Sequence, residues 1–405
     1  MIKIEKPPTP LSPNQANRRR LLVSAASLSL LSVLPACAFR SEHNHPTAIT
    51  PHNNTRDQSS KTPNTVRYIS ARADADGANY ISGFNADGQT TFDTALPERG
   101  HDIALSPDKK TAVALARRPG RFLLALDTQS GAITHASSSR PDRHFYGHGV
   151  FSPDGRWFYT TENDFERGVG VIGVRDAKRQ FKQVGEFSSF GVGPHEIALL
   201  ADGKTLVVAN GGIQTHPDTG RSKLNIDDMQ PSLVYLDRHT GTRLEQSFLP
   251  PALHQNSIRH LALTPDDRVC LVMQYEGKHR EDIPLIGLHQ CGTPIRLLSA
   301  PAPIQRRMRY YCGSVCVDAS GQLFAVSSPH GGLITFWRTD QGDCIGHTDI
   351  IDGCGIAAGT QPGEFLLSSG QGGLYRYEAK QQSLTALTQT DHDTLRRWDN
   401  HMIQL

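Results

Sequence analysis

The sequence predicts an all-β protein, a seven-bladed β-propeller that covers residues 66–405. Three observations support this prediction: an internal repeat of short strands, equal spacing of the first repeats, and a C-terminal strand that supplies what the first unit lacks. The length of 405 residues would otherwise suggest two or three domains, but a repeat can build one large unit. Helical periodicity is almost absent.

The first 37 residues are typical of an export signal. Arg18-Arg19-Arg20 precede an apolar run from Leu21 to Leu34, which is too short to span a bilayer as a stable anchor. Small residues before Cys37 resemble a lipobox, so we expect lipidation of Cys37. The arginines loosely resemble a twin-arginine signal, and the Sec and Tat routes both stay open. The alternative is a plain secretory signal with an incidental cysteine.

The segment after the signal is polar and contains prolines, so we expect a disordered linker over residues 38–65. Ala38 follows Cys37 where an aspartate would favour retention in the inner membrane. The sequence therefore predicts a monomeric periplasmic lipoprotein, anchored in the outer membrane.

Charge and cysteine content set limits on function. The formal net charge is +2, from 42 basic and 40 acidic side chains, so we expect no nucleic-acid partner. No C-x-x-C motif occurs, which gives no support to a zinc ribbon or a thioredoxin-type site. Export to an oxidising compartment predicts one or two disulfides, with fifteen pairings open. The cysteines after the signal are Cys270, Cys291, Cys312, Cys316, Cys344 and Cys354.

The repeat consists of a short apolar strand, a turn of the S-P-D-G type and a second strand of alternating apolar residues. His101, His148 and His195 are equally spaced, and the next interval is longer because residues 213–230 are inserted. The units are HDIALSPDKKTAVAL, HGVFSPDGRWFYTT, HEIALLADGKTLVVAN, HLALTPDDRVCLVM, SVCVDASGQLFAVSS and CGIAAGTQPGEFLLSS, which begin at residues 101, 148, 195, 260, 314 and 354.

A third strand follows in most units, and the linking stretch provides a fourth. Units of about 40–50 residues with four strands are typical of YVTN-like and WD40-like propeller blades. The third strands are RFLLALD, VIGVRD, LVYLD, PLIGLH, LITFWR and LYRYE.

The chain ends predict closure of the ring. RYISARAD, NYISGFNADG and TTFDTAL are three strands with no inner strand before them, whereas the C-terminal NHMIQL is an inner strand with nothing after it. We therefore expect the last strand to complete the first blade, which leaves no open sheet edge.

Histidines begin most of the predicted inner strands, which line the central channel of a propeller. Imidazoles that converge on one axis suit a transition metal, with iron or copper as candidates, or an anionic ligand. Each histidine could instead simply bind backbone at the strand entrance. Glu196 follows one of them and Glu162 lies on a nearby loop. The candidate ligands are His101, His148, His195, Glu196, His260, His401 and Glu162, while Ser314 and Cys354 begin the other two inner strands.

The register of these histidines is uneven. His101 and His195 lie five residues before the turn, whereas His148 and His260 lie four before it. Because strand side chains alternate, we expect a subset of two or three to converge unless bulges correct the difference.

Loops on the same face bring further polar residues toward the channel mouth. Those predicted to contact a ligand or to orient the imidazoles are Asn163, Asp164, Asn210, His216, Arg221, Lys223, Gln274, Tyr275 and His330. The alternative is that they only cap turns in solvent.

Several stretches resemble the exported bacterial family called domain of unknown function 1513. They include GHGVFSPDGRWFYTTENDFERGVGVIGV, GVGPHEIALLADGKTLVVANGGIQTHPDTGRSKLN and YCGSVCVDASG, and the resemblance covers about residues 66–405. It implies a seven-bladed propeller. It also implies a gene neighbourhood with imelysin-like iron-uptake components and haem-containing proteins, and hence a periplasmic role in metal acquisition.

Three functions remain open from the sequence. The first is a non-catalytic lipoprotein that binds a transition metal, or a metal-uptake partner, on the histidine-lined face. The second is a propeller enzyme of the lactonase or quinoprotein-dehydrogenase type, in which Glu162 or Glu196 activates water near a cation. The third is a protein-interaction platform that uses the inserted loop at 213–230.

Overall fold

A computed structural model describes residues 65–278, 283–388 and 396–405, which lie in one compact unit, Ser60–Leu405. Cys37, the predicted signal and nearly all of the predicted linker are outside the described residues. None of the helices in the described ranges has the length and apolar character needed to cross a bilayer.

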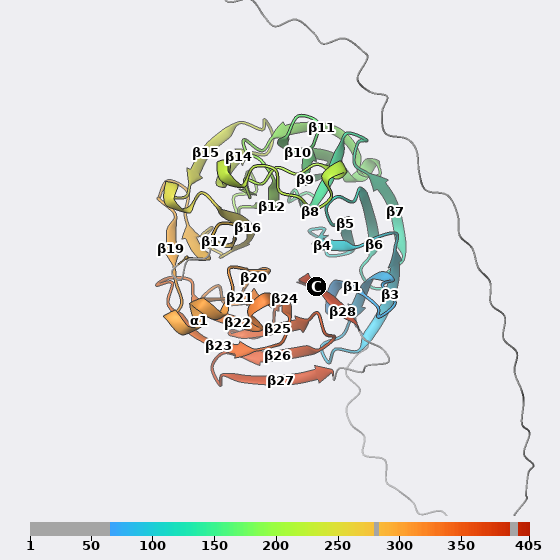
Figure 1. Ribbon diagram of the computed structural model, residues 1–405. Coiled ribbons are helices and arrows are strands. Elements are labelled where there is room, and N and C mark those ends of the chain that lie inside the picture. Colours follow the sequence, from blue (N-terminus) through green and yellow to red (C-terminus); the bar gives the residue numbers. More distant parts are fainter. Residues whose placement is uncertain (1–64, 279–282, 389–395) are drawn as a thin grey trace, which may run out of the picture. The chain divides into compact units, whose positions relative to one another are not determined.

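Five sheets contain four strands each, and every one is built from consecutive antiparallel strands. Figure 1 shows them arranged around a common centre, as in a propeller, with the first strand of each innermost. Their strands are β4 (Gly100–Leu105), β5 (Thr111–Ala116), β6 (Phe122–Asp127), β7 (Ile133–Ser138), β8 (Arg143–Phe151), β9 (Trp157–Asp164), β10 (Val169–Asp176), β11 (Lys182–Ser188), β12 (Pro194–Leu199), β13 (Thr205–Asn210), β14 (Ser232–Asp237), β15 (Arg243–Phe248), β16 (Asn256–Leu263), β17 (Val269–Tyr275), β18 (Ile286–His289), β19 (Arg296–Leu298), β20 (Ser314–Val317), β21 (Leu323–Ser328), β22 (Leu333–Arg338) and β23 (Cys344–Asp349).

An eight-stranded sheet joins the two ends of the described unit, in the order β27-β26-β25-β24-β28-β1-β2-β3. The C-terminal strand pairs antiparallel with β1 through five residue pairs, such as Ile69 with Ile403. Its only pair with β24 is Ile356 with His401, which is parallel. The strands are β24 (Gly353–Ala358), β25 (Glu364–Ser369), β26 (Leu374–Glu378), β27 (Ser383–Thr388), β28 (Arg397–Gln404), β1 (Tyr68–Ala73), β2 (Asn79–Phe84) and β3 (Thr90–Leu96).

Helices are short and lie in the connections. They are α1 (Ala302–Arg307) and the 3-10 helices Ala177–Arg179, Pro217–Thr219, Ile226–Asp228, Pro251–Leu253 and Pro329–Gly331.

The S-P-D-G turns explain why the first two strands of a sheet form a tight hairpin. After β8, the Ser152 hydroxyl donates to Asp154 and accepts from the backbone N–H of Trp157 at 2.9 Å. Gly155 has a φ of +65°, a left-handed conformation that glycine adopts without strain. The turn residues thus fix the strand register that the repeat predicts.

The hydrophobic core lies between neighbouring sheets. Central strands such as β5 and β13 are buried on both faces, and their alanine, valine and leucine side chains fill the space between blades. The outermost strands β7 and β11 alternate between exposed and half-buried residues. This gradient leaves the innermost strands free to carry polar side chains toward the centre.

The expectation of disulfides is wrong for the described residues, where all six cysteines are free thiols. Three of them, Cys270, Cys312 and Cys354, are buried and behave as small apolar side chains. Burial raises the pKa of both Cys312 and Cys354 to about 12. These thiols are therefore packing residues.

Candidate metal centre

The inner strands are irregular at the histidine positions. Register shifts occur between Gly100 and Ile103 in β4 and between Pro194 and Glu196 in β12. Comparable shifts occur in β8 and β16. A bulge changes the direction of the side chain beside it. These shifts therefore let histidines that lie four and five residues before the turn point to the same side.

Gly147 shows how closely the inner strands approach one another. It precedes His148 with a φ of +109°, and a Cβ at this position would lie 2.6 Å from Cδ2 of His101. Only glycine leaves room for the two rings to meet.

All five candidate histidines come together, rather than a subset of two or three. Three pairs have the closest ring centroids, 4.6 Å apart: His101 with His401, His195 with His260, and His260 with His401. His148 lies 4.7 to 5.4 Å from its neighbours His401, His101, His195 and His260. We call these five side chains the histidine cluster.

Carboxylates contact Nδ1 of three rings in the histidine cluster. Asp399 Oδ1 lies 3.4 Å from Nδ1 of His101, and Asp102 Oδ2 lies 3.1 Å from Nδ1 of His148. Glu196 Oε2 lies 2.9 Å from Nδ1 of His260. A carboxylate at Nδ1 fixes the tautomer and leaves Nε2 available as a ligand, the usual arrangement around histidine-bound metals.

Several nitrogens of the histidine cluster are buried and without a hydrogen-bond partner among the described residues. They are Nε2 of His148, Nε2 of His401 and Nδ1 of His195. A buried polar atom that stays unpaired costs about 1–3 kcal/mol, so its retention calls for an explanation.

The cluster contains two overlapping groups of three histidines that share His148. In each group the nitrogen atoms lie within 4.8 Å of one another. The groups are His101, His148 and His401, and His148, His195 and His260. Three imidazoles, in the neutral form that binds metal, match the ligand sets of zinc, copper and iron sites.

Burial keeps most of these imidazoles neutral. It lowers the pKa of His101 to about 4, and it lowers the pKa values of His195, His260 and His401 well below 6.5. A neutral imidazole is the form that binds metal, so these rings are ready to coordinate at neutral pH.

His148 differs from the other four rings. Burial lowers its pKa, but the carboxylates of Glu196 and Asp102 outweigh burial and raise it above 6.5. Burial in turn raises the pKa of Glu196 to about 8. The pair can therefore hold a proton at neutral pH.

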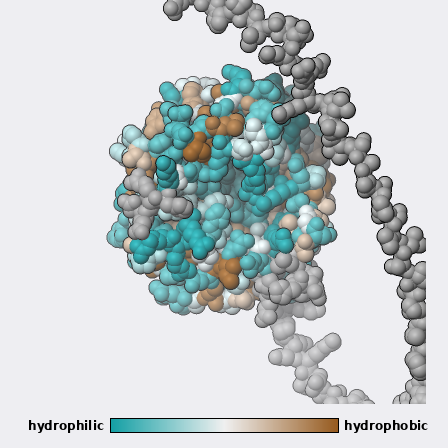
Figure 2. Space-filling model, viewed as in Figure 1, coloured by the Kyte–Doolittle hydropathy of each residue, from teal (hydrophilic) through white to brown (hydrophobic). Residues whose placement is uncertain are grey.

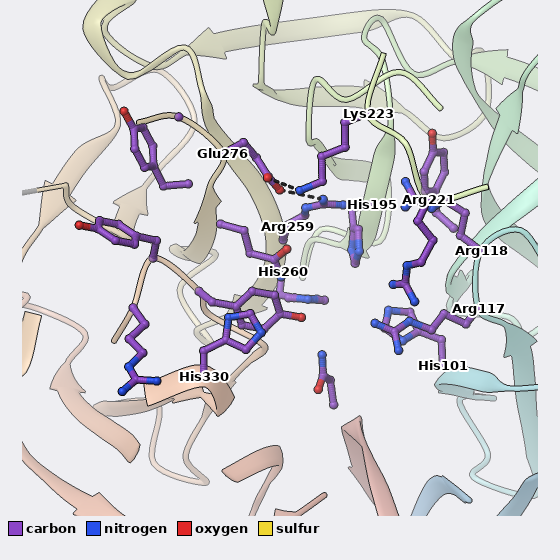
Figure 3. A pocket seen from close by; sticks show the side chains of 18 residues that line it. His101, Arg117, Arg118, His195, Arg221, Lys223, Arg259, His260, Glu276 and His330 are labelled. Carbon is purple, nitrogen blue, oxygen red and sulfur yellow. Dashed lines mark hydrogen bonds and ion pairs between the residues drawn. The ribbon is translucent and has the colours of Figure 1, made fainter. Parts of the chain in front are cut away.

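A cavity of about 510 Å³ opens against the histidine cluster, and His101, His195 and His260 line it (Figure 3). Five of the residues predicted to lie at the channel mouth also line it: Arg221, Lys223, Gln274, Tyr275 and His330. The His330 ring contacts that of Tyr311, with ring centroids 4.1 Å apart and an interplanar angle of 31°.

The prediction for Glu162 is wrong. It lies within strand β9 rather than in a loop, and its Oε1 is 2.9 Å from Nη2 of Arg175, with both side chains buried. Thr161 instead donates to the carbonyl oxygens of His148 and His195 at 3.3 Å. Because neighbouring side chains in a strand alternate, Glu162 faces away from the cluster.

Asn163 and Asp164 also belong to β9, and they do not line the cavity. Asn163 donates to Nε2 of His144 at 3.0 Å, and Asp164 lies 3.0 Å from Nη2 of Arg143. Both side chains therefore stabilise the β8–β9 region, outside the cavity lining.

Asn210 and His216 have structural contacts as well. Asn210 is buried at the end of β13 and donates to the carbonyl oxygen of Ser189 at 2.9 Å. His216 caps the helix Pro217–Thr219, and its Nδ1 accepts from the Asp218 N–H at 3.2 Å.

Sequence reasoning missed the carboxylates Asp102 and Asp399 and the cavity arginines. Asp102 directly follows His101, and Asp399 lies two residues before His401. Their proximity to histidines in the sequence was the available signal. The missed cavity cations are Arg117, Arg118, Arg259 and Arg309.

A structure titled Kuenenia stuttgartiensis Hydrazine Synthase is similar in fold. The identity is 16% and the TM-score 0.53, over 84% of this chain and 100% of that chain. At this identity the likeness concerns the fold alone. A search of curated proteins gave no match.

The sequence profile of one family matches residues 94–405, which is most of the chain and includes every residue of the histidine cluster. Its description is protein of unknown function, DUF1513. The chain belongs to this family.

Proposed function

We propose that this protein binds a transition metal ion in the histidine cluster and serves as a non-catalytic metal-binding component of the cell envelope. Two observations together support this proposal: carboxyl groups contact Nδ1 of three rings, and three other ring nitrogens of the cluster have no partner among the described residues. Histidines that only stabilise a strand entrance would use both ring nitrogens for protein contacts.

Imidazole ligands narrow the metal to zinc, copper, iron or nickel, and we propose iron or copper. A three-histidine set without thiolate does not favour the soft-ligand sites of Cu(I) or iron–sulfur clusters. Calcium and magnesium prefer oxygen ligands and are not expected to bind the cluster.

We also propose that the sheets form a propeller of seven blades. The eight-stranded sheet divides into two blades, β24–β27 and β28 with β1–β3, because a single residue pair joins its halves. In this arrangement β28 closes the ring as the inner strand of the first blade. Closure brings Asp399 and His401 to the cluster from the far end of the chain.

We further propose export of the chain, lipidation at Cys37 and attachment to the outer membrane from the periplasmic side. The support is the sequence of residues 1–38. An imelysin-like or haem-containing envelope protein would be the partner that delivers or receives the metal, as the family resemblance implies.

Of the two carboxylates proposed to activate water in an enzyme, only Glu196 remains a candidate. Glu162 pairs with Arg175 away from the cavity, and Glu196 does not line the cavity either. One observation supports the alternative of a protein-interaction platform: Arg221 and Lys223 from the inserted loop line the cavity.

Metal analysis tests the proposal directly. The mature chain, refolded without metal and then exposed to iron, copper or zinc, is expected to retain about one ion per chain after gel filtration. Binding should protect against thermal unfolding, since a ligand at 100 times its Kd stabilises the native state by about 2.7 kcal/mol. No retained metal and an unchanged melting temperature would contradict the proposal.

A further inference from the structure

The cavity beside the histidine cluster is strongly cationic. Apart from the histidines, the charged residues in the described part of its lining are six cationic side chains and one carboxylate, that of Glu276. The chain as a whole carries a formal net charge of only +2, so the positive charge is concentrated locally. The six cations are Arg117, Arg118, Arg221, Lys223, Arg259 and Arg309.

These cations come from four separate parts of the described chain. Arg117 and Arg118 follow β5, and Arg259 lies within β16. Arg221 and Lys223 lie in the long connection between β13 and β14, and Arg309 follows α1. In Figure 3 the labelled arginines and Lys223 lie along the upper and right-hand sides of the cavity.

The charge is only partly compensated. Glu276 forms an ion pair with Lys223 and lies 3.9 Å from Nη2 of Arg259. Among the described residues, no carboxylate comes within ion-pair distance of the other four cations, which are Arg117, Arg118, Arg221 and Arg309.

One buried polar atom at the cavity, Nε of Arg259, has no hydrogen-bond partner among the described residues. Arg259 is only 9% exposed. Burial also lowers the pKa values of Arg117, Arg118 and Arg259. A bound anion would satisfy the free donor and repay the cost of burying these charges.

The size and the side-chain chemistry of the cavity identify a class of ligand. A volume of about 510 Å³ suits a small molecule rather than a macromolecule. Guanidinium groups bind carboxylate and phosphate oxygens through paired hydrogen bonds, and tyrosine hydroxyls add single donors. Figure 2 shows a largely hydrophilic face with a hollow at its centre. These features favour a charged ligand over an apolar one.

We propose that this cavity is a binding site for a small polyanion that carries two or more carboxylate or phosphate groups. The anion lies among Arg117, Arg221 and Arg259, with one end against the imidazoles of His195 and His260. Anion binding at this site does not require a metal, so it can be tested separately from metal binding in the cluster.

Calorimetric titration of the metal-free chain tests the proposal, with citrate and pyrophosphate as the two probes. Acetate and glycerol serve as the singly charged and neutral controls. We expect at least one polyanion to bind at least 100-fold tighter than acetate, and its affinity to fall as salt is raised. The preferred probe tells carboxylate from phosphate recognition. If neither polyanion binds tighter than acetate, the proposal is overturned.

A charge variant assigns the binding to this cavity. Arg221 and Arg309 are exposed and have no ion pair among the described residues, so the double variant R221Q/R309Q should fold normally. We expect it to weaken polyanion binding at least 10-fold. The matched control R179Q/R338Q removes two exposed arginines that do not line the cavity and should leave binding unchanged. Equal loss in both variants would overturn the assignment.

Discussion

Buried histidines occur in two kinds of surroundings in this protein. In the sheets, His144 contacts the carbonyl oxygen of Phe145 through Nδ1 at 2.9 Å and accepts from Asn163 through Nε2 at 3.0 Å. In the cluster, His148 contacts Asp102 through Nδ1, but its Nε2 has no partner among the described residues. Both residues are 1% exposed, so burial does not distinguish them.

His289 follows the pattern of His144. Its Nδ1 lies 2.7 Å from the Tyr235 hydroxyl and its Nε2 lies 3.2 Å from the Ser247 hydroxyl. His144 and His289 therefore have two satisfied nitrogens each, whereas the cluster retains buried nitrogens with no partner among the described residues. The comparison teaches that the state of the second nitrogen, rather than burial, separates a structural histidine from a candidate ligand.

The largest expected effect comes from comparing two single variants, in which His148 or His144 is replaced by alanine. His148→Ala removes the residue that both three-histidine groups share, so we expect metal affinity to fall more than 100-fold, beyond the ~10–100-fold cost of losing an outer partner. His144→Ala leaves the Asn163 amide unpaired and should cost about 1–3 kcal/mol of stability without changing metal affinity.

Competition with a chromophoric chelator measures the affinity of both variants, and urea unfolding measures their stability. Equal metal affinities in His148→Ala and His144→Ala would contradict the claim that the cluster histidine binds metal and the sheet histidine does not.

Loss of the carboxylate partners should have a smaller effect. Glu196→Gln and Asp399→Asn keep the side-chain shape but replace the carboxyl groups that contact Nδ1 of His260 and His101. We expect a ~10–100-fold loss of metal affinity for each. Glu186→Gln, at an exposed strand remote from the cluster, is the control. Affinities unchanged in both carboxylate variants would show that these contacts do not serve a metal.

The stability of the metal-free chain should depend on pH through histidines of both kinds. Burial lowers the pKa values of His144 and His101 to about 4, below the ~6.5 of an unfolded chain. A lowered folded-state pKa contributes stability that is present above pH ~6.5 and is lost as the pH falls toward 4. The free energy of unfolding should therefore decrease between pH 6.5 and 5.

Urea unfolding at several pH values checks this prediction, and His144→Gln should flatten part of the slope. A profile that is flat between pH 6.5 and 5, or a slope unchanged in the variant, would contradict the account of neutral buried rings.

The smallest expected effect is at Cys354, which begins an inner strand where other sheets have a histidine. Its thiol lies 3.5 Å from the Ser368 hydroxyl and 3.4 Å from the Trp398 carbonyl oxygen, and burial raises its pKa to about 12. A neutral, occupied thiol is a poor ligand. Cys354→Ala should leave metal affinity within twofold of the parent chain, and a thiolate-to-metal absorption band in the loaded protein would refute this.

Much of the fold could be predicted from the sequence because the information is local. The Ser152-Pro153-Asp154-Gly155 turn fixes its hairpin through its own hydrogen bonds, and the apolar alternation on either side marks the strands. The first unit lacks an inner strand in the sequence, which predicted the position of the last strand. The structure pairs β28 with β1.

The site could be predicted only in part because it depends on contacts between distant segments. The recurring histidines marked the five candidate rings, but only two or three were expected to converge, because the bulges that aim them are not encoded in a recognisable motif. Glu162 was misplaced because its partner Arg175 lies on the neighbouring strand. Arg117 and Arg309 are far apart in the chain, and only the folded sheets bring them to one cavity.

The most direct test of the metal-binding proposal is X-ray absorption at the metal edge of the loaded chain. The linker histidines His43, His45 and His52 should be replaced by alanine to remove competing ligands. The account predicts three or more imidazole nitrogens at about 2.0–2.1 Å from the metal, a signal that His148→Ala loses. A shell of oxygen ligands alone, or an unchanged spectrum in His148→Ala, would contradict it.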